Sequence, residues 1–83
     1  MAGVARLVLI LGLEDESAII RAAESVANAS INENMRVSFK EAGAVKHLVQ
    51  LINHTSQTVR FAAVKALERL SVRLFNIPAL LIV

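Results

Sequence analysis

Few side chains in this sequence have the types and spacing that metal or acid–base chemistry requires. His47 and His54 are seven residues apart and would share a helix face, but no third or fourth ligand lies at the spacing of a metal site. Residues 14–16 form an acidic run whose adjacent carboxylates point in divergent directions. We interpret this run as negative charge at a helix start, where it meets the positive end of the helix dipole. We therefore predict no metal site.

The hydroxyl side chains are poor candidates for nucleophilic catalysis. Thr55, Ser56 and Thr58 lie together, yet no activating base and no oxyanion glycine accompanies them in a recognised order. Residues of this type are typical of helix caps. The chain has no cysteine, which excludes a disulfide framework and a thiolate zinc site. We expect no catalytic residue and no cofactor.

Residues 42–71 predict two amphipathic helices joined by a polar turn at residues 53–56. In the first helix, apolar residues recur at the spacing of one helical face: Val45, Leu48, Val49 and Ile52. In the second helix, another apolar stripe follows: Val59, Ala63, Ala66, Leu67 and Leu70. Gly43 precedes the first helix, where a residue without a Cβ permits a sharp corner. Two helices alone leave faces bare, so the unit is built for stacking.

A second, weaker copy of this pattern precedes the first. When the sequence is shifted by 41 residues, Leu7 and Val8 fall on Leu48 and Val49, and the acidic run falls on the polar turn. A helical period of about 40–47 residues is typical of HEAT and armadillo solenoids. The apolar positions and the turn stay in register without a gap, which favours a true repeat.

The stretch from Phe39 to Leu70 resembles an armadillo repeat. Three segments carry the resemblance: FKEAGAV at 39–45, LVQLI at 48–52 and AAVKALERL at 62–70. It implies an all-α fold, an armadillo-type α-solenoid fragment of about one and two-thirds repeats. The repeats would cover residues 3–72, as a partial repeat at 3–30 and a full repeat at 31–72, before a divergent apolar tail at 73–83. HEAT repeats are the near alternative, but the glycine corner and short leading helix favour armadillo.

From this pattern we expect five helices and no strands. They are placed near residues 3–12, 16–29, 34–41, 44–52 and 57–72. Repeat arrays gain stability from their neighbours and need about three repeats. We therefore expect the isolated chain to be marginally stable and to self-associate through its uncapped ends.

The resemblance also implies a binding surface. In armadillo arrays the long third helices line a concave groove with residues four apart, which here are Glu24 and Asn28, then Phe61, Lys65 and Arg69. Nuclear-import adaptors hold an extended basic peptide with Trp and Asn in these rows, and this chain keeps only Asn28. Its Lys65 and Arg69 favour an acidic peptide instead. The alternative interpretation is a solvated helix face without a ligand.

The function predicted from this resemblance is a non-catalytic protein–protein interaction module that binds an extended segment. The alternative is a truncated or recruiting portion of a larger armadillo protein, such as a U-box ubiquitin ligase. A net charge of +2 without a Lys/Arg run argues against nucleic acid. Residues 7–13 superficially resemble a signal peptide, but an acidic run follows them directly. We expect no membrane span and a cytoplasmic or nuclear location.

Overall fold

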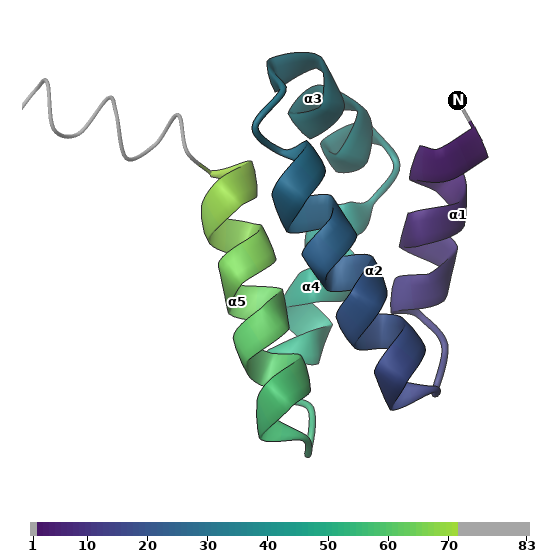
Figure 1. The fold of residues 1–83 in the computed structure, drawn as a ribbon, viewed down its shortest axis with the longest axis vertical. Helices are drawn as coiled ribbons and strands as arrows, with labels where there is room; N and C mark the ends of the chain where they lie inside the picture. The colour runs from purple at the N-terminus through teal and green to yellow at the C-terminus, as the bar shows by residue number, and fades with distance from the viewer. Residues whose placement is uncertain (1, 72–83) are drawn as a thin grey trace, which may run out of the picture.

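The computed structural model describes residues 2–71, and the regular elements of this part of the chain are five α-helices (Figure 1). They are α1 (Ala2–Leu11), α2 (Glu16–Ala29), α3 (Glu33–Glu41), α4 (Ala44–Leu51) and α5 (Gln57–Leu70). The predicted all-α fold class is confirmed, and every helix end lies within two residues of its expected position. The expected apolar tail at 73–83 lies outside the described residues.

The helices form two similar pairs that lie side by side. α1 packs on α2 and α4 packs on α5, while α2 and α5 form the most extensive contact between the pairs. The helix α1 also contacts α4, so each helix of one pair lies next to its counterpart in the other. The short helix α3 lies at one end and contacts α1, α2 and α4 (Figure 1).

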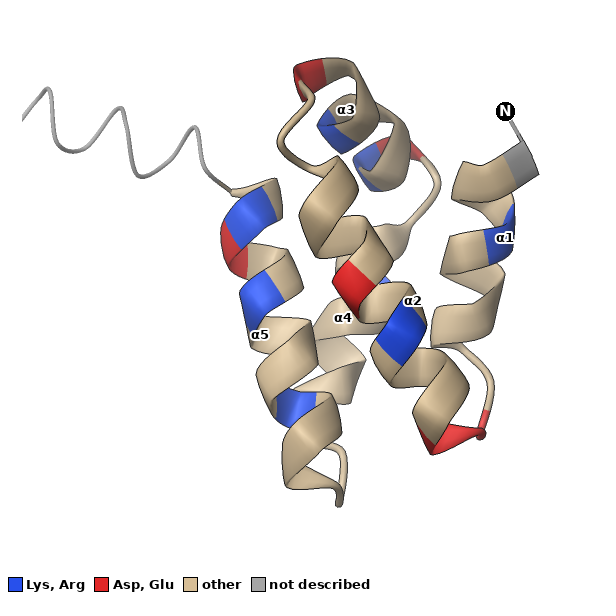
Figure 2. Ribbon diagram, viewed as in Figure 1, with Lys and Arg blue, Asp and Glu red and all other residues tan. Residues whose placement is uncertain are grey.

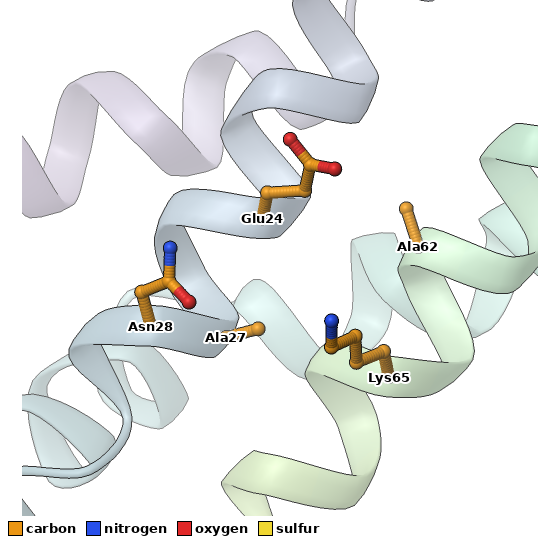
Figure 3. A pocket seen from close by; sticks show the side chains of 5 residues that line it. All are labelled: Glu24, Ala27, Asn28, Ala62 and Lys65. Carbon is orange, nitrogen blue, oxygen red and sulfur yellow. The ribbon is translucent and has the colours of Figure 1, made fainter.

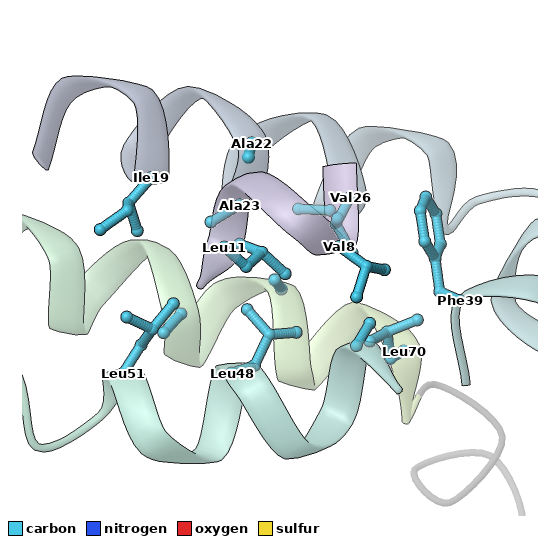
Figure 4. Close-up of a cluster of buried hydrophobic side chains, with 14 of the residues drawn as sticks. Val8, Leu11, Ile19, Ala22, Ala23, Val26, Phe39, Leu48, Leu51 and Leu70 are labelled. Atoms are coloured by element: carbon cyan, nitrogen blue, oxygen red, sulfur yellow. The ribbon is translucent and has the colours of Figure 1, made fainter. Parts of the chain in front are cut away.

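The hydrophobic core lies between the two helix pairs and receives side chains from all five helices (Figure 4). Its largest fully buried apolar side chains are Leu11 of α1, Ile19 and Val26 of α2, Phe39 of α3, Leu48 of α4, and Val59 and Leu70 of α5. Burying one such side chain contributes about 1.5–3 kcal/mol. Because these residues lie far apart in the sequence, the core holds the two pairs together.

The predicted buried face of α4 is wrong in part. Leu48 is fully buried as expected, but Val45 and Ile52 are each 38% exposed and Val49 is 47% exposed. The core instead receives Leu51, together with the small Ala44 at the start of the helix. The reason is that α4 is apolar around most of its circumference. Spacing along such a helix predicts an apolar side without deciding which neighbours cover it.

Three helices begin with the side-chain caps typical of their residue types. Asp15 Oδ1 accepts a hydrogen bond from the Ala18 backbone N–H at 3.2 Å. Asn32 and Ser56 cap α3 and α5 in the same manner. The Ser56 hydroxyl also donates to Glu16 Oε1 at 2.7 Å, which joins the starts of α2 and α5. The interpretation of residues 14–16 and of Ser56 as helix-start residues is confirmed for Asp15 and Ser56.

Two arginines fasten the loops that precede their own helices, a feature that the sequence analysis missed. Arg36 Nη1 donates to the carbonyl oxygens of Ser30 at 2.6 Å and Ile31 at 3.1 Å. Arg60 Nη1 donates to those of His54 at 2.7 Å and Thr55 at 3.1 Å. Each arginine lies four residues after its helix cap. Hydrogen bonds to a charged group are worth about 1.5–3 kcal/mol, so both loops are held firmly.

Replacing Gly43 with alanine is expected to lower the free energy of unfolding by about 1–2 kcal/mol. Gly43 has φ of +90°, in the left-handed region, and a Cβ there would meet no atom within 4 Å. The loss would therefore come from backbone strain alone. Gly3→Ala is the matched control, because this helical glycine also has open space around it and alanine favours a helix. Urea denaturation should show opposite signs for the two variants; equal midpoints would contradict the strain at Gly43.

Candidate functional site

The candidate site lies where α2 and α5 pass side by side. Both helices place small residues at their contact, and Ala23, Ala27, Ala63 and Ala66 are each at most 1% exposed. Alanine side chains let two helix backbones approach closely, because the distance between helix axes depends on the side chains at the contact. The polar residues at the edge of this contact are therefore brought near one another.

A pocket of about 290 Å³ lies along this contact. Ala27 of α2 and Ala62 of α5 form its apolar part, while Glu24, Asn28 and Lys65 supply its polar groups. In Figure 3, Glu24 and Asn28 extend from α2 and Lys65 extends from α5. The pocket thus has an acidic and amide wall on α2 and a basic wall on α5.

Three of the five residues predicted from the sequence line this pocket, namely Glu24, Asn28 and Lys65. The other two, Phe61 and Arg69, lie on α5 one turn to either side of Lys65 and are not among the lining residues. Phe61 is 64% exposed, and Arg69 is half-buried. Their role in binding stays a prediction. The analysis from sequence missed Ala27 and Ala62, although their small size is what leaves room for a pocket.

The charges of the site differ between its two helices. Figure 2 shows basic bands recurring along α5, whereas α2 carries one acidic and one basic band next to each other in its middle. Glu24 and Lys65 are exposed, so water and salt screen their fields over a Debye length of about 8 Å at physiological ionic strength. A ligand that displaces water from the pocket would strengthen its interaction with both groups, since attraction rises as the local dielectric falls.

A second hollow lies between α1 and α3, with a volume of about 420 Å³. It is lined by Val4, Ala5, Met35, Ser38, Glu41 and Ala42. The sequence analysis did not find it, because its two walls come from helices about 30 residues apart in the chain. Ser38 and Glu41 are its only polar side chains and both come from α3, so it lacks the convergent polar groups of the first pocket.

The two histidines have separate structural surroundings. His54 Nδ1 accepts a hydrogen bond from the Ser56 backbone N–H at 3.0 Å. The His47 ring lies against Gly12, where an added Cβ would come within 3.2 Å of the ring. Within residues 2–71, no group of three or more His, Cys, Asp or Glu side chains is placed to hold a metal ion. None of the helices described has both the length and the hydropathy of a membrane span.

Comparison with known proteins identifies the second helix group. Residues 32–72 match the family model of the armadillo/beta-catenin-like repeat, a match of one repeat length. No significant match was found among curated proteins or among solved structures. The resemblance predicted from the sequence is thereby confirmed for this segment, which comprises α3, α4 and α5.

Proposed function

We propose that this chain, whose residues 32–72 are an armadillo repeat, is a protein-interaction module that binds an extended partner segment across α2 and α5. Armadillo repeats are typically non-catalytic and serve as surfaces for other proteins. The observation that supports this site most directly is the pocket lined by Glu24, Asn28 and Lys65. Its polar groups converge over an alanine floor, an arrangement typical of binding sites.

The geometry favours a partner segment with two charged positions. Packed helices lie about 8–10 Å apart, and an extended chain advances about 3.3 Å per residue. A segment that crosses both helices would therefore place about three residues between α2 and α5. We expect a basic or amide residue opposite Glu24 of α2 and an acidic residue opposite Lys65 and Arg69 of α5. Because the sequence has no cysteine, we place this interaction in a reducing compartment, the cytoplasm or the nucleus.

Reversing the charge of the α5 wall is expected to weaken the binding of an acidic peptide about tenfold. The test compares wild type with Lys65→Glu/Arg69→Glu by fluorescence anisotropy, using short labelled peptides of alternating Asp and Ser or of alternating Lys and Ser. Wild type should prefer the acidic peptide, and the variant should prefer the basic one. The reason is that complementary charge across a partly desolvated contact favours one sign of ligand.

Lys40→Glu/Lys46→Glu is the matched control for this experiment. Both lysines are exposed, neither lines the α2/α5 pocket, and the double replacement changes the net charge by the same amount. The control should keep the wild-type preference for the acidic peptide. If both double variants lose that preference equally, the effect comes from net charge and the proposed groove is wrong.

A further inference from the structure

We propose that copies of this chain associate head to tail, with the outer face of α1 and α2 of one copy packed on the outer face of α4 and α5 of another. Such packing would repeat, between copies, the contact that holds the two helix pairs of one chain together. It needs both faces in one molecule, in the same register and with compatible charges. The described residues supply all three conditions.

The register comes from the 41-residue shift between the two helix pairs. Adding 41 to the bounds of α2, Glu16 and Ala29, gives Gln57 and Leu70, the bounds of α5. The order of contacts agrees, because α1 packs on α2 as α4 packs on α5. We therefore treat residues 3–30 as the second and third helices of a repeat, equivalent to those in residues 44–71.

The face of α4 and α5 that points away from the first pair is apolar and uncovered. In the first pair, Val8, Leu11 and Ala23 belong to the core between the pairs and are at most 7% exposed. Their counterparts after the shift are Val49, Ile52 and Val64, which are 38–47% exposed. The residues that receive the second pair within one chain are thus repeated on the second pair, where none of the described helices covers them.

The opposite face, on α1 and α2, has the side chains needed to fit there. Leu48 and Ala66 are fully buried where the second pair packs into the core. Their counterparts are Leu7, which is half-buried, and Ser25, which is exposed. Leucine is retained at the first position, and a small residue at the second keeps the close approach of the helices possible.

The charges at the junction between copies would also be complementary. The shift replaces the α2 lining of the pocket, Glu24, Ala27 and Asn28, by Lys65, Glu68 and Arg69. It replaces the α5 lining, Ala62 and Lys65, by Arg21 and Glu24. At the junction, Lys65 and Arg69 of one copy would therefore face Glu24 of the next, and Glu68 would face Arg21. Opposite charges at each position favour this register over others.

This interface is heterologous, since one copy contributes a different face from the other. Such contacts do not close at a dimer and produce assemblies that grow with concentration. The expected behaviour of the 83-residue chain is thus a sedimentation-average mass that rises through a dilution series without a plateau at two copies.

Two single substitutions test the two faces separately. Val64→Glu puts a charge on the α5 face, and Ser25→Glu puts the same charge on the α2 face; each should weaken association by about tenfold or more, because an unpaired charge would be buried. Each variant alone should sediment as a monomer. Their equimolar mixture should form a discrete dimer, because one partner keeps each intact face.

Leu9→Glu is the control, since Leu9 is 69% exposed and its counterpart Gln50 is exposed as well. This variant should associate as wild type does, and circular dichroism should show that all three variants are folded. Val64→Lys repeats the test with the opposite charge. A monomeric wild type at every concentration would overturn the proposal and point to another occupant of the α4/α5 face, such as residues 72–83. An association that Ser25→Glu leaves intact would indicate a symmetric dimer and would also overturn it.

Charge exchange tests the register itself. Arg21→Glu and Glu68→Arg should each weaken association several-fold, because each places like charges opposite one another. The chain that carries both replacements restores the pair in the reverse sense and should recover the wild-type dissociation constant. If the double variant associates no better than the single variants, the 41-residue register between copies is wrong.

Discussion

Phe39→Ala is expected to lower the free energy of unfolding by about 3–5 kcal/mol. Phe39 is the largest fully buried side chain and has no exposed surface. It extends from α3 into the core beside Val26 and Leu70 (Figure 4). Removing its ring would leave a cavity where three helices meet. A protein of 83 residues has a total stability of roughly 4–12 kcal/mol, so the variant should be largely unfolded near physiological temperature.

The same substitution at Phe61 is the matched control. Phe61 lies on α5 and is 64% exposed, so Phe61→Ala should change the free energy of unfolding by about 0.5 kcal/mol or less. Thermal denaturation followed by circular dichroism, at one low protein concentration for all samples, provides the comparison. Similar melting temperatures for Phe39→Ala and wild type would show that α3 does not contribute its aromatic ring to the core.

Leu48→Ala is expected to lower the free energy of unfolding by about 2–5 kcal/mol. Leu48 is fully buried in the middle of α4, and in Figure 4 it points toward the other side chains of the core. The α4 helix is short, at eight residues, and isolated helices of this length are marginal in water. Its stability therefore depends on the contacts that Leu48 and Leu51 make with neighbouring helices.

Two controls separate this effect from a general loss of apolar surface. Leu9→Ala removes the same atoms from a side chain that is 69% exposed and should change stability by about 0.5 kcal/mol or less. Val49→Ala tests the other side of α4 and should also have a small effect in the monomer. Urea denaturation measures all three. If Val49→Ala and Leu48→Ala were equally destabilising, the buried side of α4 would be the one expected from the sequence.

These predictions show where local pattern and tertiary packing contribute separately. The positions of the five helices follow from signals only a few residues long. Asp15 and Ser56 cap their helices, and Gly43 adopts the left-handed backbone that ends α3 and starts α4. Caps, corners and helical periods depend on hydrogen bonds and rotations within about four residues. They can therefore be inferred from the order of the residues.

The candidate site was predictable only in part. The spacing of four residues on α2 and α5 predicted that Glu24, Asn28 and Lys65 share one side of the molecule, and all three line the pocket. The pocket itself needs the close approach of Ala27 and Ala62, which are 35 residues apart in the chain. How closely two helices approach depends on the side chains of both, so neither segment alone contains the answer.

The sequence by itself thus determined the helices, their amphipathic character and the 41-residue repeat. Only the tertiary structure decided which side of α4 is buried and that Phe39 belongs to the core. It alone also showed that Arg36 and Arg60 hold the loops before their helices. The physical reason is that an apolar residue gains free energy from any neighbour that excludes water. Which neighbour does so is decided by segments that meet only when the whole chain is folded.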